Sequence, residues 1–490
     1  MALKPSQITR RNFVQRAGLL VTSLGVAGGI QSGLMDSIIR KANKKWGGEA
    51  LAAAGGPVAF SVEILFRAGF QMNSLFPSRG HKEDARNPAL NIYSSPNSIL
   101  EINPTGNKKA YIASFGAGMG GDKLRTVINT INAGGERVGL ATSEAIVLQT
   151  SQHTGNFASR APNTNAACPA VMHAAVAPSV AVNGIEWNNG VATTNQRGSL
   201  AALARVKDRT EFQSLFRDLP MYFTKEELQL IVGVIDNGST TTRGSIDDLD
   251  DMFRIKNVQG SNEVAQVSLA GRGQAQLSLI AALDTAYNNN MARFGTPAQL
   301  NQALGGAQLG VAMNSAIAAF SVGASTTFTI SLDSNDWHGD INPMDSATDK
   351  QGIWNTYVGN ALAGFLDAAA NTVNPHAPTE KIIDSLCISL QSEFTRTPNR
   401  NGGGTGGDNG DGGQGSMAFI GSRVKTGAYG DILGSGAVRG FDPTSGATIA
   451  ASPNVTEAMV WKTHAELLGI PASMSGMVAA QPVMGLVKTV

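Results

Sequence analysis

The chain has 490 residues, of which 38 are basic and 37 acidic, and its formal net charge of +1 gives no electrostatic reason to bind nucleic acid or anionic lipid. Residues 1–54 hold eight of the basic and two of the acidic residues, so the remainder is mildly acidic. The two cysteines, Cys168 and Cys387, exclude a disulfide scaffold and a zinc finger. Cys387 lies in an apolar stretch and is expected to be a free core thiol, although one disulfide between the two remains open. This length suits one large α/β domain or two ordinary domains.

The N-terminal segment has the layout of an export signal. Arg10 and Arg11 precede a moderately apolar stretch over 17–30 that is too short to be a good membrane span. Paired arginines here indicate the twin-arginine (Tat) route, with the Tat translocase as partner and the periplasm or cell surface as destination. The alternative is an amphipathic first helix that happens to contain Arg-Arg. Processing at 50–54, near Gly28 or not at all stays open, and no later apolar stretch is long enough to span a bilayer.

Short apolar stretches bounded by turn residues predict the strands of the N-terminal half. These expected strands are 58–66, 110–114, 137–140 and 174–182. A helical middle is expected over 199–323, where apolar residues recur at three- and four-residue spacing. The helices predicted within it are 199–206, 211–216, 225–234, 274–294 and 297–320. Thr224 is expected to cap the third of them, with Glu227 completing a capping box.

The C-terminal half alternates between strands and helices. The expected strands are 326–332, 382–390 and 417–420, and the expected helices are 352–369 and 455–468. Such alternation implies right-handed crossovers and a parallel sheet with helices on both faces. Residues 399–415 form a glycine-dominated loop that has little to bury. We therefore expect 55–490 to be a single α/β domain, built on a mainly parallel sheet flanked by helices, with a helical insertion in the middle.

Polar residues follow three of the predicted strands, at the end where open parallel sheets bind ligands. The most conspicuous run is 333–340, which contains three aspartates and one histidine. Asp336 and His338 stand two residues apart, and such a set of side chains can hold a divalent metal. The alternative is a polar turn whose aspartates cap the next element.

The other two strand ends carry fewer candidates. Glu393 is a candidate ligand or base, and Arg396 can hold an anion with two hydrogen bonds. The alternative is an internal Glu–Arg ion pair that fixes the turn. Ser74 is the hydroxyl that follows the first strand, and His153 is a further candidate ligand or base. Four other histidines have no polar residues grouped around them and are expected at the surface or in the core: His81, His173, His376 and His464.

Taken in order, these segments resemble the domain of unknown function 1501 family, Tat-exported bacterial proteins related to the alkaline phosphatase and sulfatase superfamily. The most specific match is Ser-Glu-Phe-Thr-Arg-Thr-Pro at 392–398 with Asn-Gly-Gly-Gly at 401–404, where the family has Ser-Glu-Phe-Gly-Arg-Thr-Pro and an Asn-Gly-rich run. Asp-Trp-His at 336–338 is similar to the family's Asp-Thr-His. Asn-Ser-Leu-Phe-Pro at 73–77 is similar to its Asp-Thr-Phe-Asp-Pro. The resemblance covers roughly residues 8–30, 58–80 and 310–425.

The resemblance implies an alkaline-phosphatase-like fold and a divalent metal, zinc, calcium or manganese. The residues that would hold the metal are Asp336, His338, Glu393 and Asp408. Arg396 would balance the charge of a phosphate or sulfate ester, and Ser74 would be the nucleophile.

Several positions depart from the family pattern. Asn73 and Phe76 stand where the family has aspartates, and no histidine follows the glycine-rich loop before His464. An amide binds a divalent cation more weakly than a carboxylate does, and a phenyl ring does not bind one in this way. The resemblance therefore implies a degenerate, non-catalytic member with a binding or structural role in the cell envelope. The alternative is a metal-dependent hydrolase of phosphate or sulfate esters.

Overall fold

The computed structural model describes the chain in segments. The described residues are 60–67, 72, 75–80, 99–102, 109–114, 117–118, 120–147, 168–177, 182, 184–188, 203–217, 279–303, 307–333, 350–392, 414–432, 438–470 and 480–488. Residue contacts divide the chain into two units. The larger comprises Pro57–Pro178, Val182–Glu211 and Ala286–Val490, and the smaller comprises Met1–Gly56, Ser179–Ala181 and Phe212–Thr285.

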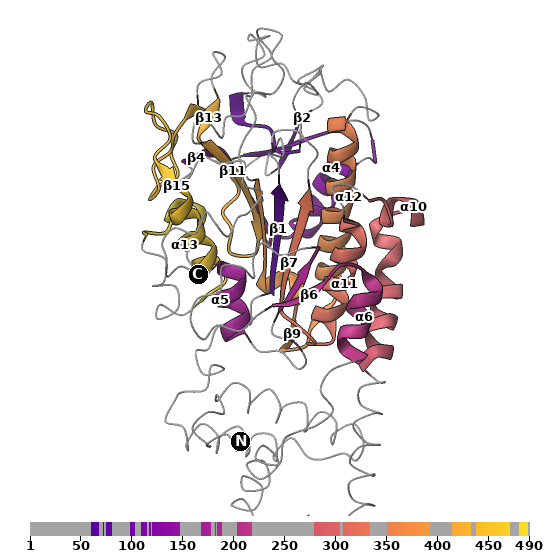
Figure 1. Ribbon diagram of the computed structural model, residues 1–490. Coiled ribbons are helices and arrows are strands. Elements are labelled where there is room, and N and C mark those ends of the chain that lie inside the picture. The colour runs from indigo at the N-terminus through magenta and orange to yellow at the C-terminus, as the bar shows by residue number, and fades with distance from the viewer. Residues whose placement is uncertain are drawn as a thin grey trace, which may run out of the picture. The chain divides into compact units, whose positions relative to one another are not determined.

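A nine-stranded, mostly parallel sheet forms the centre of the larger unit (Figure 1). The strands are β1 (Phe60–Arg67), β4 (Gly139–Val147), β5 (Ile185–Trp187), β6 (Ala204–Val206), β7 (Thr327–Asp333), β10 (Leu386–Ser392), β11 (Gln414–Gly421), β12 (Gly427–Tyr429) and β15 (Val455–Thr456). Their order is β12-β4-β11-β10-β1-β7-β5-β6, and β15 also pairs with β4. Only β11 runs antiparallel to its neighbours among these described strands. The expected α/β fold with a mainly parallel sheet is confirmed.

Strand β1 shows how the sequence makes a sheet with two different faces. Side chains alternate across a strand, so the odd and even positions of β1 lie on opposite faces. The even positions are apolar and fully buried: Phe60, Val62, Ile64 and Phe66. Ser61 and Glu63 lie on the other face and are also buried. The even positions therefore pack into an apolar core, whereas the opposite face has a polar interior.

Three helices cover the apolar face: α4 (Gly120–Ile131), α11 (Leu309–Ser321) and α12 (Lys350–Asn371) (Figure 1). Aromatic contacts join α11 and α12 to β1. The rings of Phe60 and Phe320 lie 5.0 Å apart between centroids, and those of Phe66 and Trp354 lie 6.4 Å apart. These contacts anchor both ends of β1 to the helices.

Two helices, α5 (Pro169–Val176) and α13 (Glu457–Leu467), lie on the opposite face (Figure 1). His173 of α5 is hydrogen-bonded to the hydroxyl of Thr327 in β7 at 2.6 Å. The ring of His464 in α13 lies 5.5 Å from that of Phe419 in β11. Helices therefore flank the sheet on both faces, as expected. None of the helices in the described segments is long and apolar enough to cross a bilayer.

Small elements complete the larger unit. They are the paired strands β2 (Ile99–Ile102) and β3 (Ala110–Ala113), β8 (Val373–Asn374) and β9 (Ala377–Lys381), and β13 (Asp431–Ile432) and β14 (Val438–Arg439). Short helical segments are α10 (Pro297–Leu300), η8 (Met291–Phe294), η9 (Ile382–Ser385) and η10 (Met484–Leu486).

Two predictions of secondary structure were wrong in type. The stretch 174–182 was expected to be a strand, but its first residues belong to helix α5, which begins at Pro169. A short, uniformly apolar run does not distinguish a strand from a buried helix. The stretch 199–206 was expected to be a helix, but its last three residues form β6 and pair with β5. Pairing with the sheet overrides the weak local preference of so short a segment.

Three other predictions merged separate elements. The helix expected over 297–320 is two helices, α10 and α11. The strand expected over 382–390 begins with the turn η9 and continues as β10. The helix expected over 455–468 begins after the two-residue strand β15, where the hydroxyl of Thr456 caps α13 by accepting the N–H of Met459 at 3.4 Å.

The expected helical middle is described in part. Helix α6 (Arg209–Arg217) confirms the helix predicted at 211–216, and residues 279–290 are helical. The described residues of the smaller unit belong to these two segments, and Gln213 donates a hydrogen bond to Asp284 at 2.7 Å between them. The helix predicted at 225–234 and its cap Thr224 lie outside the described residues.

Candidate functional site

Three neighbouring parallel strands end at the same level of the sheet. Phe66 of β1 is paired with Leu332 of β7 on one side and with Ser392 of β10 on the other. Adjacent strands lie about 4.8 Å apart, so the ends of β7 and β10 are roughly 10 Å from each other. We call the edge formed by the last residues of β1, β7 and β10 the carboxyl edge. The segments that contain the candidate metal ligands begin directly after β7 and β10, and therefore leave the sheet from neighbouring points.

The predicted site residues themselves lie outside the described residues. This applies to the candidate ligands Asp336, His338, Glu393 and Asp408, to Ser74, Arg396 and His153, and to Arg10 and Arg11 of the signal. The structure describes the strands that precede three of these segments. The assembly of their side chains into one site stays a prediction.

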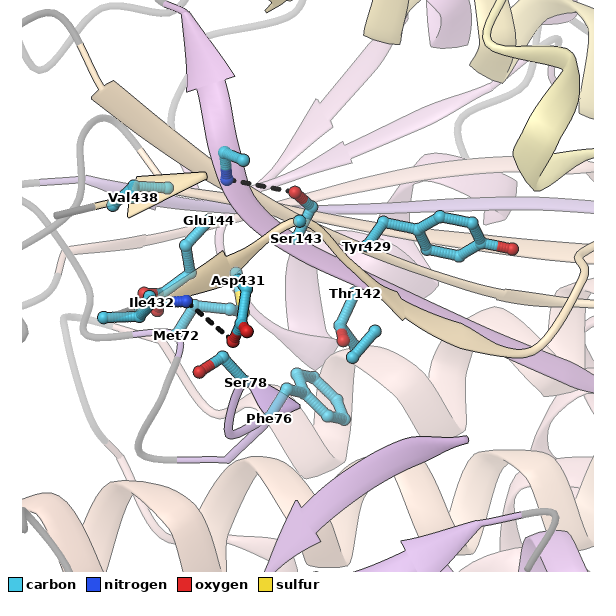
Figure 2. A pocket seen from close by; sticks show the side chains of 13 residues that line it. Met72, Phe76, Ser78, Thr142, Ser143, Glu144, Tyr429, Asp431, Ile432 and Val438 are labelled. Carbon is cyan, nitrogen blue, oxygen red and sulfur yellow. Dashed lines mark hydrogen bonds between the residues drawn. The ribbon is translucent and has the colours of Figure 1, made fainter. Parts of the chain in front are cut away.

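A hollow lies beside strand β4, in the carboxyl half of the sheet (Figure 2). Through β11 and β10, Ser143 of β4 is level with Leu65 of β1, two residues before β1 ends. In the described segments, β12 pairs with β4 as far as Ser143 and β15 pairs with it from Ile146. The hollow lies at the level of β4 where its pairing with β12 ends and its pairing with β15 begins. Its free volume is about 10 Å³, which is roughly the room of one water molecule. Its walls come from Met72, Phe76 and Ser78, from β4, from 428–432 and from Val438.

Hydroxyl and carboxyl groups surround the hollow. Figure 2 shows Ser78, Thr142, Ser143, Glu144 and Asp431 around it. The Ser143 hydroxyl accepts a hydrogen bond of 3.0 Å from the backbone of its own strand, which fixes its direction. Thr142 and Glu144 are nearly buried, with 4% and 8% of their surface exposed. The polar side of the hollow is therefore built mainly on a rigid strand.

Asp431 ties two walls of the hollow together. One of its carboxylate oxygens accepts the backbone N–H of Gly80 at 2.8 Å and that of Ile432 at 2.9 Å. Burial raises the pKa of this carboxyl group, and the two hydrogen bonds and the charges of Arg79 and Arg439 counteract part of the rise. Asp431 thus has a structural role as well as a place in the lining.

The remaining wall is apolar. Met72, Phe76, Ile432 and Val438 provide it, and Phe76 is only 2% exposed. Tyr429 contributes its ring, whereas its hydroxyl donates to backbone carbonyl oxygens within the protein. Phe76 is one of the two residues that replace the aspartates of the resembled family, and it stands in this wall.

This lining presents polar groups to a space that holds about one water molecule or one polar group of a ligand. Two carboxyl groups and three hydroxyls opposite an apolar wall suit a molecule that carries hydroxyl or positively charged groups. Within the segments that the structure describes, no group of three or more His, Cys, Asp and Glu side chains is placed to hold a metal ion.

A second polar group is buried on the α5/α13 face of the sheet. Glu186 of β5, Thr329 of β7, Glu63 of β1 and Ser389 of β10 form one level row across four strands. His464 of α13 packs onto this row, with its Nδ1 3.7 Å from Oε1 of Glu63. The side chain of His464 is fully buried and that of Glu63 is 3% exposed.

Burial shifts the titration of this acid and this base in opposite directions. It raises the pKa of Glu63 from 4.5 to about 7; the neighbouring Thr329 hydroxyl counteracts part of this rise and the charge of Glu186 adds to it. Burial also lowers the pKa of His464 from 6.5 to about 3, with a smaller contribution from His173. Both side chains are therefore uncharged in mildly acidic solution.

The two cysteines belong to the same interior. Cys168 precedes α5 and Cys387 lies in β10, and both are buried free thiols. The expectation of a free core thiol at Cys387 is confirmed. Burial raises the pKa of Cys168 well above its ordinary value and that of Cys387 to about 12. Neither thiol is in the thiolate form near neutral pH.

Neither the hollow nor the interior polar row was identified from the sequence. The signal for the row was present, because Glu63 is the one charged residue in the apolar stretch 58–66. His173 and His464 are core residues, as one of the two expectations for them allowed, but they lie among polar side chains. The hollow had no comparable signal, because its walls come from segments far apart in the sequence.

No model of a known protein family matches this chain, and no curated protein or solved structure matches it. The family resemblance drawn from the sequence motifs stays a prediction.

Proposed function

We propose that this chain is an exported, divergent relative of the alkaline phosphatase and sulfatase superfamily that lacks two-metal catalysis and binds a ligand in the cell envelope. Its ligand site is the hollow beside β4. The part of the ligand that enters the hollow is a single hydroxyl or positively charged group, because the space holds only about one water molecule.

The position of Phe76 carries this proposal. The resemblance places a metal-binding aspartate at this position, but the phenyl ring here is buried in the apolar wall of the hollow. Asn73, the other replaced aspartate, supplies an amide and so a weaker ligand than a carboxylate. The sequence therefore lacks the two carboxylates that the resembled family has after its first strand. A buried phenyl ring occupies the position of one of them.

The arrangement of strands supports the superfamily relationship. The three strands that precede the resembling motifs, β1, β7 and β10, are adjacent and parallel in the middle of the sheet. Helices on both faces of a mostly parallel sheet are what such a relative requires. Export by the Tat translocase to the periplasm or cell surface is supported by Arg10, Arg11 and the apolar stretch that follows them.

A second function, a metal-dependent hydrolase of phosphate or sulfate esters, is favoured by one observation. The segments that contain Asp336, His338 and Glu393 leave the sheet from strand ends only roughly 10 Å apart. An extended chain covers about 3.3 Å per residue, so five residues after β7 span this gap. Carboxylate oxygens and an imidazole nitrogen are suitable donors for zinc, manganese or calcium. A bound ion would polarise an ester oxygen, Arg396 would hold the ester's negative charge, and Asp408 would add a fourth donor.

Metal content distinguishes the two functions. The full chain is equilibrated in turn with zinc, manganese and calcium, freed of unbound ions and analysed for bound metal. The variants Asp336→Ala and His338→Ala are treated in the same way, and Glu466→Gln, which removes a carboxylate on the surface of α13, is the matched control. We expect no stoichiometric metal that depends on Asp336 and His338. Bound metal that is lost in both of these variants and kept in Glu466→Gln would favour the hydrolase.

A further inference from the structure

The contact between Glu63 and His464 joins a buried acid to a buried base beneath the C-terminal helix α13. Neither ring nitrogen of His464 has a hydrogen-bond partner among the described residues, and Oε2 of Glu63 has none either. The other titratable side chains that interact electrostatically with this pair come from β5, α5 and β10. They are Glu186 of β5, Cys168 before α5, His173 of α5 and Cys387 of β10.

Removing one member of the pair would leave the proton exchange of the other member uncompensated when α13 opens. Opening of α13 exposes both groups to water together, because one lies on the helix and the other on the strand beneath it. We propose that Glu63 and His464 form a pH-compensating pair, in which the opposite proton exchanges of the two side chains keep the docking of α13 on the sheet nearly constant between mildly acidic and neutral pH.

The contribution of Glu63 has a definite sign. Its pKa is about 7 in the closed protein and returns toward 4.5 on opening, so opening releases a proton. Rising pH therefore favours opening between these two values, by up to roughly tenfold per pH unit, and the effect levels off above pH 7.

The contribution of His464 has the opposite sign. Its pKa is about 3 in the closed protein and returns toward 6.5 on opening, so opening takes up a proton. Falling pH therefore favours opening between these two values. The two windows overlap from about pH 4.5 to 6.5, where the proton released by one group is taken up by the other. Export as proposed above would expose the protein to two compartments, but the inference does not depend on it.

The two cysteines provide a local readout of opening. Both are buried in the core cluster that contains Trp461 and Ala465 of α13, and they are the only cysteines in the chain. Labelling by a soluble thiol reagent under native conditions is measured from pH 5 to 8 on the full chain. The proteins compared are the unmodified chain, Glu63→Gln, His464→Gln and the double variant. Rates are compared at the same pH, so that the ionisation of the thiols themselves cancels.

We expect the two single variants to diverge from the unmodified chain in opposite directions. The ratio of the unmodified rate to the Glu63→Gln rate should rise by a factor of roughly 50 to 100 from pH 5 to 8. The ratio of the unmodified rate to the His464→Gln rate should fall by a factor of roughly 30 over the same range. The ratio of the unmodified rate to the double-variant rate should change by less than about threefold from pH 5 to 8.

Ratios that do not change with pH, or that change in the same direction for both variants, would overturn the proposal. If His464→Gln does not fold, its thiols react on mixing at every pH, and the Glu63→Gln comparison decides alone. A rising ratio then supports the compensating pair, and a flat ratio excludes it.

Discussion

The backbone N–H of Gly80 donates a hydrogen bond of 2.8 Å to the carboxylate of Asp431, and so joins the segment after β1 to strand β13. The same oxygen accepts the N–H of Ile432. The bond from Gly80 holds two segments at the candidate ligand site together although they are far apart in the sequence, whereas the bond from Ile432 is local to β13.

Replacing Asp431 by alanine should therefore loosen the hollow. Two buried backbone donors lose their acceptor, and we expect the free energy of unfolding to fall by about 1–3 kcal/mol. Chemical denaturation measures this change. Asp442→Ala is the matched control, because that carboxylate accepts bonds only within its own exposed turn at Thr444 and Ser445. An Asp431→Ala protein as stable as the control would contradict the assigned role.

The contact between α4 and α12 predicts a sharp difference between two glycine substitutions. A Cβ on Gly359 would overlap the backbone of Gly120 and Gly121, so Gly359→Ala must separate the helices. Overpacking of this kind costs about 1–3 kcal/mol of unfolding free energy. Gly134→Ala places its Cβ in open space and should leave stability nearly unchanged. Equal melting temperatures of the two variants would show that the helices can move apart freely.

The ionisation of Glu63 predicts a pH-dependent gain in stability on substitution. Above pH 7 the unmodified protein carries this buried charge, whereas Glu63→Gln does not. From pH 5 to 8 the variant should gain about 2–3 kcal/mol of unfolding free energy relative to the unmodified chain. Urea unfolding at the two pH values measures this. A relative stability that falls toward pH 8 would reverse the assigned direction of the pKa shift.

The buried thiols predict resistance to modification. Since burial raises the pKa of both Cys168 and Cys387, the folded chain at pH 8 should react with a thiol reagent only as fast as it opens. In strong denaturant both thiols should react at once, with or without a reductant. Rapid labelling of the folded protein, or a mass that reveals a disulfide, would contradict the buried free thiols.

The paired arginines predict dependence on one export route. Replacing both Arg10 and Arg11 by lysine keeps the charge of the segment but removes the Tat signature. We expect the variant chain to stay in the cytoplasm of a bacterium with a working Tat translocase, whereas the unmodified chain leaves it. Fractionation and immunodetection measure the distribution. Unimpaired export of the variant would remove the Tat assignment.

The main strands could be predicted from the sequence because they are buried on both faces. β1 and β7 follow apolar stretches whose bounds agree with the structure to within two residues. The same reasoning failed at α5, where an apolar run of alanine, valine and methionine fits a buried helix equally well. It also failed at β6, where three residues become a strand through pairing with β5.

The candidate site and the buried polar row were less predictable because their residues are brought together by the fold. Glu63 was visible as a charge in an apolar strand, but its partner His464 lies near the other end of the chain. Ser143 and Glu144 were missed because β4 was expected to end at residue 140 and in fact continues to Val147. Local periodicity does not reveal which distant segment covers a strand.

The rate of aryl phosphate and aryl sulfate hydrolysis by the full chain tests the central claim most directly. It is measured with zinc, manganese and calcium in turn, beside the double variant Asp336→Ala/His338→Ala. A binding protein without two-metal catalysis should give the same background rate in both proteins with every ion. Metal-dependent hydrolysis that the double variant abolishes would contradict the account and identify the chain as a hydrolase.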